Sequence, residues 1–583
     1  MLQIITEKFF PPGERYETLH RAILYTNYRV MRGEKIITPI GYLLPSTGLH
    51  SLATLTCEML EKQEKYPDGP KLGVFVATTG DDLLNDFAAV ISFFLNVTCT
   101  PDPDLTRRLL LAERPSLGIE AVPSRFIRRM FDKDVHARDG EAAALTAFIK
   151  QLIGLERETF VGAMRAIRQF VIGSHRLADD LNLAYTLFVT SIESLAQGFD
   201  GHVAEWSDYD PRKRKKIDGA LKDASDEVAA GVRDAILSNE HVALARRFRD
   251  FAMAHVAPSF FRVEAAGAQG PISGPDLPIA LQQAYSIRSS YVHLLRDVPR
   301  QLTISGFPEA TEVDDRKTLS FAGLSRLSRH IIMQFIARGR IVEREAFDYR
   351  RELPGIVTVK LSPEYWVAST GGFDHKTAPV RLAAFLEQIT AAVLQHQKDA
   401  KLTDLGPILT MVEHSVSGLR KPSQRLPMLT LYFLFHQFAG PEFSCKQWPA
   451  LFEKHKADFD APTVESFVAH LITGNRVEWT LEQLEELHKT YFKTRHTASV
   501  TKIGLLLEAA LSLYVAEVNR LAGNNARARA LVAFAVDSHP GHAALRTYEA
   551  SLPAELAEIN WTGILLPPRP SSEGPSADPV PAA

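Results

Sequence analysis

The sequence predicts a multidomain, mainly α-helical protein with an α+β N-terminal domain, a central helical bundle and a C-terminal region of helical hairpins. The first observation behind this prediction is length, because 583 residues are too many for one hydrophobic core. The second is that runs rich in β-branched and aromatic residues are concentrated near the N-terminus. The third is the recurrence of apolar residues at helical spacing from about Glu141 onward.

Residues 1–140 make up the predicted α+β domain. Three segments separated by Gly, Pro or charged turns predict strands: HRAILYTNYRV, KIITPIGYLLP and KLGVFVATT. Asp81 and Asp82 then begin a predicted helix, DDLLNDFAAVISFFLNV, which is apolar along one side. The polar segment that ends at Gly140 favours a domain boundary there. No phosphate loop, catalytic triad or metal motif assigns a chemistry to this domain.

The central bundle is predicted over residues 141–340, and two of its helices carry polar stripes. The first lies in LNLAYTLFVTSIESLAQ, where Asn182, Thr186, Thr190 and Glu193 share one face. Two such stripes in one bundle either line a wet cleft or face solvent, and the second alternative is favoured because most polar helix faces are exposed.

The second helix, Asp276 to Arg296, is the most clearly bounded in the chain. Asp276 is a natural N-cap, Pro278 falls in the first turn, and Pro299 follows the end. The expected apolar face contains Arg288, where an unpaired guanidinium would be costly, so the arginine needs a carboxylate, a phosphate or an edge to reach past. The apolar residues of that face are Leu277, Leu281, Ala284, Val292 and Leu295.

His293 lies on the polar stripe of the same helix, together with Gln282, Ser286 and Ser289. Positions five residues apart on a straight helix point about 140° away from each other. Arg288 and His293 can therefore act on one target only if the helix bends, if Arg288 reaches round its edge, or if each side chain has a different partner.

The C-terminal part is predicted as a connector, a helical region and a tail. Residues 341–375 contain a short apparent strand around Ile356 to Leu361. Residues 376–565 are almost entirely helical, and the breaks at Gly523-Asn524-Asn525 and His539-Pro540-Gly541 produce paired helices similar to a TPR unit. Residues 566–583 are rich in Pro, Ser and Ala, which predicts a disordered tail.

Composition narrows the class of protein. The net charge of −3, with 45% hydrophobic and 23% charged residues, is that of an ordinary soluble protein, so any RNA binding must be local. Cys57, Cys99 and Cys445 are far apart and show no metal-binding spacing, which predicts a reducing compartment and no structural metal. No signal region or membrane-spanning apolar run is present, and a cytoplasmic location is expected.

Three segments together resemble the HEPN superfamily of all-helical ribonucleases, and most closely the ApeA-type HEPN proteins of bacterial antiphage defence. They are LNLAYTLFVTSIESLAQ, AYSIRSSYVHLLR with its Arg-x-x-x-x-His motif, and LSFAGLSRLSRHIIMQFIAR. The resemblance implies that residues 141–340 are a HEPN bundle. It also implies an endoribonuclease that acts by abortive infection, without metal or other cofactor, in which two motifs meet across a dimer cleft.

The implied catalytic residues are Arg288 and His293, with Glu193 of the Ser-Ile-Glu-Ser-Leu element as an orienting residue. Imidazole can move a proton near neutral pH, and guanidinium carries a permanent charge in a fork that fits a phosphate. The helical wheel links Glu193 to His293 before Arg288. The implied nucleophile is the 2′-OH, so the expected substrate is RNA, single-stranded or tRNA. The partners implied are a second copy of the chain and a phage-derived trigger, for which residues 1–140 are the candidate sensor.

Further residues are candidates for RNA contact. Arg212, Lys213, Arg214, Lys215 and Lys216 form either a phosphate-binding patch or a solvated turn. Tyr291 either stacks on a base or packs in the core. Arg249 and His255 have similar spacing and are the reserve catalytic pair, although an amphipathic core helix with its arginines pointing outward explains that segment more simply.

A competing interpretation comes from another class of protein. In it, the chain is a catalytically silent HEPN bundle that joins a sensor to a TPR-like platform for protein partners. Ser289 directly after Arg288, where the family often has Asn, Asp or His, and the absence of overall positive charge favour this alternative.

Overall fold

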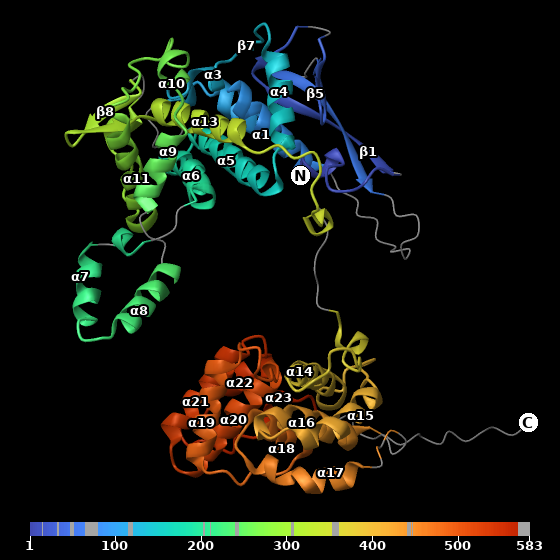
Figure 1. Cartoon of the computed structure of the whole chain (residues 1–583). Helices are drawn as coiled ribbons and strands as arrows, with labels where there is room; N and C mark the ends of the chain where they lie inside the picture. Colours follow the sequence, from blue (N-terminus) through green and yellow to red (C-terminus); the bar gives the residue numbers. More distant parts are fainter. Residues whose placement is uncertain are drawn as a thin grey trace, which may run out of the picture. The chain divides into compact units, whose positions relative to one another are not determined.

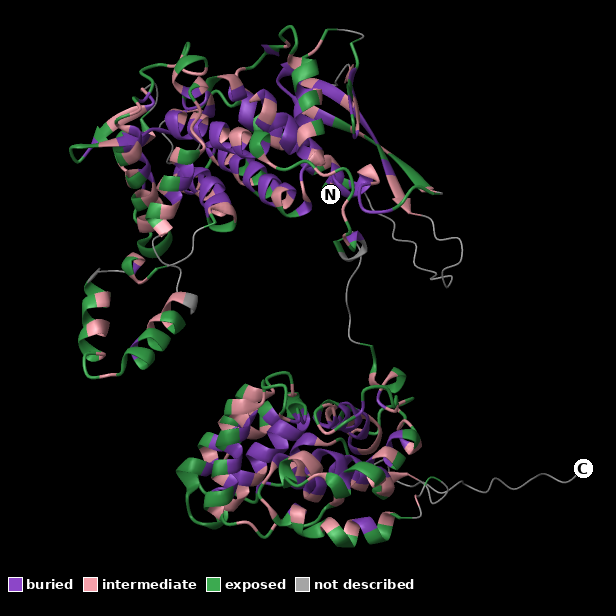
Figure 2. Ribbon diagram, in the orientation of Figure 1, coloured by how far each residue is buried: buried purple, intermediate pink, exposed green. Residues whose placement is uncertain are grey.

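A computed structural model of the chain describes residues 1–13, 15–31, 34–46, 52–64, 80–114, 121–201, 205–209, 211–239, 244–304, 308–352, 361–439, 443, 445 and 447–568. The chain is mainly helical, with a small antiparallel sheet near the N-terminus (Figure 1). It divides into two compact units, Met1–Val357 and Thr358–Ala583. Each unit encloses its own cluster of buried apolar side chains (Figure 2).

The sheet of the first unit has five strands in the order β3-β4-β5-β1-β6, all antiparallel. Its long members, β1 and β5, pair along their whole length, and Gly41 of β4 allows close approach to β5, because a Cβ there would lie 2.1 Å from the carbonyl oxygen of Glu58. The strands are β1 (Arg15–Thr26), β3 (Ile36–Thr38), β4 (Gly41–Ser46), β5 (Ala53–Glu64) and β6 (Cys99–Thr100), and β2 (Tyr28–Arg29) pairs separately with β7 (Val135–His136).

Two of the three predicted strand segments are confirmed, since HRAILYTNYRV contains β1 and β2, and KIITPIGYLLP contains β3 and β4. The third, KLGVFVATT, lies outside the described residues. Strand β5 was not predicted, although Leu55, Cys57 and Met59 are all buried in it.

Helix α1 (Asp81–Leu95) packs its predicted apolar side into the core of the first unit. Its last carbonyl groups, which a helix leaves without partners, are capped from the bundle. Arg329 donates from Nε to the carbonyl oxygen of Phe93 at 2.8 Å and from Nη2 to that of Phe94, and Arg129 donates to that of Leu95 at 3.1 Å. These bonds join residues 1–140 to residues 141–340 in one compact unit with a continuous core.

The bundle itself is built around α5, α6 and α13. Helices α5 and α6 pack against each other, α13 packs on both, and α11 packs on α6 and α9. The longer helices are α4 (Glu141–Gly154), α5 (Arg157–Arg176), α6 (Leu181–Phe199), α7 (Pro211–Ala220), α8 (Asp226–Asn239), α9 (Leu244–Ala254), α11 (Leu277–Leu294) and α13 (Phe321–Arg338). Shorter elements are α2 (Pro103–Leu111), α3 (Arg128–Phe131), α10 (Ser259–Arg262), α12 (Arg300–Thr303) and the hairpin of β8 (Ala310–Val313) and β9 (Arg316–Leu319).

The second unit is helical throughout its described residues. Its helices are α14 (Ala378–Ile389), α15 (Gly406–Ser415), α16 (Pro422–Phe438), α17 (Trp448–His455), α18 (Val464–Thr473), α19 (Leu481–Thr494), α20 (Leu505–Leu521), α21 (Asn525–Ser538), α22 (Ala543–Ala550) and α23 (Trp561–Leu565). The two predicted breaks fall between α20 and α21 and between α21 and α22. The strand predicted around Ile356 lies outside the described residues, as does most of the predicted tail. Every described helix is too short or too polar to cross a bilayer.

Candidate active site on helices α6 and α11

Helix α11 begins where the sequence predicts and ends in an unusual conformation. Pro278 occupies the first turn, but the carboxylate of Asp276 does not cap the helix and instead accepts a hydrogen bond from the Ser273 hydroxyl at 2.8 Å. At the other end, Leu295 adopts left-handed backbone with φ 52°, which is rare for a branched apolar residue. Its N–H bonds to the carbonyl oxygens of Ser290 and Tyr291, so the helix terminates directly after the motif.

Arg288 forms an ion pair with Glu193 of α6, with 2.6 Å between Nη2 and Oε2. The Glu193 side chain is only 4% exposed and that of Arg288 18%, so both groups are largely shielded from water. A buried carboxylate needs such a partner, because the desolvation of an unpaired charge is costly. The predicted need of Arg288 for a carboxylate is therefore met. The prediction that Glu193 serves His293 first is wrong, because α11 turns Arg288 and not His293 toward α6.

Two neutral side chains complete the surroundings of Glu193. The Tyr285 hydroxyl and the Gln197 amide each donate to Oε1 at 3.3 Å. Burial raises the pKa of Tyr285, and the negative charge of Glu193 raises it further. Nε of Arg288 is buried and has no hydrogen-bond partner among the described residues, so the guanidinium is held by the carboxylate but not saturated.

His293 lies on the other side of α11 and is exposed. No hydrogen bond or ion pair links its side chain to another residue in the described part of the chain. The helix is continuous over the motif, so the 140° separation expected for a straight helix persists within one chain. Val292 and Leu295 were predicted on the buried face, and this prediction is wrong because the last turn of α11 leaves the core and exposes both residues, together with Leu294.

The five consecutive cations form part of a helix, α7, and not a turn. Arg212, Lys213, Lys215 and Lys216 are exposed, and Arg214 is half-buried. The ammonium of Lys213 lies 5.6 Å from the Tyr209 ring. This basic run is therefore outside the helix pair that holds Glu193 and Arg288.

Tyr291 is half-buried on α11. Partial burial raises its pKa, and the negative charges of Asp180 and Asp297 add to this effect. The side chain thus belongs to the edge of the bundle, between the two alternatives of core residue and exposed stacking platform.

The reserve pair on α9 is engaged locally. Arg249 pairs with its neighbour Asp250 at 2.8 Å, and Nδ1 of His255 lies 2.9 Å from the carbonyl oxygen of Phe251. Burial lowers the pKa of His255. Phe248 and Phe251 are buried while the arginines of α9 pair at its outer edge, so the simpler prediction of an amphipathic helix is confirmed.

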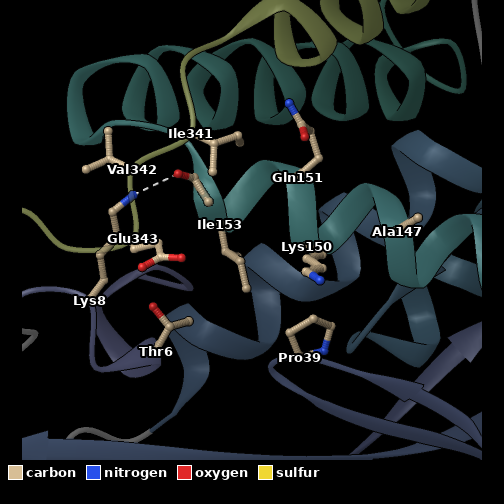
Figure 3. Close-up of a pocket in the computed structure, with 11 residues that line it drawn as sticks. Thr6, Lys8, Pro39, Ala147, Lys150, Gln151, Ile153, Ile341, Val342 and Glu343 are labelled. Atoms are coloured by element: carbon tan, nitrogen blue, oxygen red, sulfur yellow. Dashed lines mark hydrogen bonds between the residues drawn. The ribbon is translucent and has the colours of Figure 1, made fainter. Parts of the chain in front are cut away.

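Two hollows were not anticipated from the sequence. One, of about 550 Å³, lies between the N-terminal segment, α4 and residues 341–343 (Figure 3). Val342 donates to the Gly154 carbonyl at its edge, and Lys8 donates to the same carbonyl at 3.0 Å. The other is a groove of about 440 Å³ between α11 and the β8–β9 hairpin. Its turn, Asp314-Asp315, has positive φ at both residues, a conformation that Asp tolerates and that makes such a dipeptide a hairpin signal.

In the part of the chain that the structure describes, no three His, Cys, Asp or Glu side chains gather closely enough to hold a metal ion. No protein family model, no curated protein and no solved structure matches the chain.

Proposed function

We propose that this chain is a metal-independent HEPN-type endoribonuclease of bacterial antiphage defence, located in the cytoplasm, with residues 141–340 as the HEPN bundle. The observation that carries the proposal is the ion pair between Glu193 and Arg288. The resemblance selects these two residues from segments far apart in the sequence, and in the fold their side chains meet. His293 follows on the exposed side of the same helix, where a substrate can reach it.

The proposed reaction needs a base, an acid and positive charge at the phosphate. The base removes the 2′-OH proton, the 2′-oxygen forms a bond to phosphorus, and the bond from phosphorus to the 5′-oxygen breaks. The acid protonates the leaving 5′-oxygen, and a 2′,3′-cyclic phosphate remains. His293 is proposed as the proton-transfer group. Arg288, held by Glu193, is proposed to neutralise the charge that develops on the phosphate.

One copy of α11 directs Arg288 and His293 to different sides, so the proposed active form is a dimer. Exposed Val292, Leu294 and Leu295 surround His293 and offer apolar surface for a second copy of the chain. In such a dimer the imidazole of one copy and the guanidinium of the other converge on one phosphodiester. This arrangement requires Arg288 to shift its contacts with Glu193 when substrate binds.

The proposal is tested by incubating the full chain with total RNA in the presence of a chelator. Fragments with cyclic-phosphate ends are expected, and Arg288→Ala and His293→Ala are expected to abolish them without loss of the fold. Matched controls are Arg128→Ala and His136→Ala, which remove an exposed arginine and an exposed histidine of the same unit. Cleavage at the wild-type rate by both motif variants would contradict the proposal.

A second function is favoured by the same ion pair. Because Glu193 already satisfies Arg288 and His293 has no partner in the described part of the chain, the bundle also fits a non-catalytic scaffold that joins a sensor to a TPR-like platform. The RNA assay distinguishes the two functions, since a scaffold yields no fragments with any trigger.

A further inference from the structure

The groove between α11 and the β8–β9 hairpin carries polar groups that the fold does not use. Arg296 and Arg316 line it, and neither guanidinium has an ion-pair partner within the described residues. The hydroxyls of Ser286 and Ser290 also line it and make no side-chain hydrogen bond in the described part of the chain. Donors that face a groove without internal partners are available to a ligand.

The groove is held in place by bonds on both sides. Asn182 of α6 accepts from the Val298 backbone and donates to Asp297, each at 2.8 Å, which fixes the segment after α11. On the hairpin side, Thr318 is buried and its hydroxyl donates to the Arg316 carbonyl at 3.2 Å. The lining is therefore built from supported backbone, with the two arginine side chains at its exposed edges.

The position of the groove relates it to the motif. Ser286, Ser290 and His293 are spaced four and three residues apart, so they follow one stripe along α11. Ser290 and His293 are separated by about 4.5 Å of helix rise. A strand lying in the groove would thus continue toward the exposed imidazole. Its volume of about 440 Å³ lies in the range of small-ligand sites and suits a nucleotide unit.

The chemistry of the lining matches a ribose–phosphate backbone. A guanidinium fork binds phosphate oxygens, and hydroxyl groups both donate to and accept from a 2′-OH. Asp314 also lines the groove and has no partner among the described residues, so it repels phosphate or accepts from a hydroxyl. The groove thus alternates cationic and hydroxyl-binding positions, unlike the run of cations on α7.

We propose that this groove binds the backbone of a single RNA strand beside the phosphodiester that is cleaved, with Arg296 and Arg316 on phosphates and Ser286 and Ser290 on ribose. The assignment rests on the proposed ribonuclease function and names its substrate-binding surface. It places the main phosphate contacts of the strand on this groove, and not on Arg212 to Lys216.

Binding is measured on the full chain carrying His293→Ala, so that cleavage does not interfere. The probe is a fluorescein-labelled ten-nucleotide single-stranded RNA without self-complementarity, titrated at several salt concentrations, with the same DNA sequence in parallel. Adding Arg296→Gln and Arg316→Gln is expected to weaken RNA binding about 100-fold and to lower the slope of log K against log salt by about 2, one for each lost phosphate contact. Asp314→Asn is expected to strengthen binding several-fold.

The matched control adds Arg107→Gln and Arg128→Gln, which remove the same net charge from exposed positions on α2 and α3. It is expected to leave RNA affinity within twofold. Equal weakening by control and groove variants, unchanged affinity in the groove variant, absence of RNA binding, or DNA binding as tight as RNA binding would each overturn the inference. The proposed function fails separately, if the wild-type chain cleaves no RNA although the groove variant weakens RNA binding.

Discussion

The ion pair between Glu193 and Arg288 makes a prediction about stability that does not depend on catalysis. Arg288→Met leaves a carboxylate that is 4% exposed with only two long hydrogen bonds from neutral donors. The expected loss in free energy of unfolding is roughly 3 kcal/mol, at the lower end of the range for breaking a buried pair because Arg288 retains some exposure. Glu193→Gln leaves the guanidinium with a neutral partner and is expected to cost roughly 2 kcal/mol.

The double variant is expected to lose less than the sum of the single variants, by about 2 kcal/mol, because the two charges are removed together. Hydrogen exchange of peptides from α6, measured in rising urea, reports the stability of the first unit in the full chain. The matched control is the pair of Arg176 and Asp179, which lie 2.9 Å apart with side chains 41% and 32% exposed. There, Arg176→Met, Asp179→Asn and their combination are expected to change stability by less than about 1 kcal/mol. Strict additivity at the buried pair would refute the reasoning.

Three further predictions concern the first unit. Gly323→Ala is expected to cost roughly 2 kcal/mol or more, because its Cβ would lie 2.1 Å from the Glu309 carbonyl oxygen, whereas Gly231→Ala, with open space around it, is expected to gain about 0.5 kcal/mol; urea unfolding compares them, and equal effects would be inconsistent with the contact. Burial, aided by the charge of Arg176, lowers the pKa of His175 from 6.5 to about 4, so the unfolded chain binds its proton first and stability is expected to fall, by roughly 3 kcal/mol at most, as pH falls from 6.5 to 4. His175→Gln should remove that part of the pH dependence, and an unchanged profile would disprove it. Arg329→Met is expected to lower stability by roughly 3 kcal/mol, measured by calorimetry, because it uncaps α1; a change below about 1 kcal/mol would contradict this.

Much of the helical architecture follows from local sequence patterns. Pro278 and the apolar spacing of Leu277, Leu281 and Ala284 located α11, and the Gly523-Asn524-Asn525 break separated α20 from α21. These signals depend on neighbouring residues in the chain, which a sequence shows directly. The requirement of Arg288 for a carboxylate was also predictable, because the cost of a buried charge is general.

The failures concern contacts between distant segments. The partner of Glu193 depends on how α11 is rotated against α6, which a helical wheel for each helix does not determine. Val292 and Leu295 fit an apolar stripe but lie beyond the point where α11 leaves the core. The predicted boundary after Gly140 coincides with the start of α4, whereas Arg329 connects α1 to α13 across more than 200 residues of sequence.

Mixing two inactive variants tests most directly whether Arg288 and His293 of different copies act on one phosphodiester. Arg288→Ala and His293→Ala chains are unfolded together, refolded as a mixture and incubated with RNA and chelator. The account predicts that cleavage, absent from each variant alone, returns in the mixture as 2′,3′-cyclic-phosphate fragments, because mixed dimers contain one guanidinium and one imidazole at a shared cleft. A mixture that forms such dimers but remains as inactive as its components would contradict it.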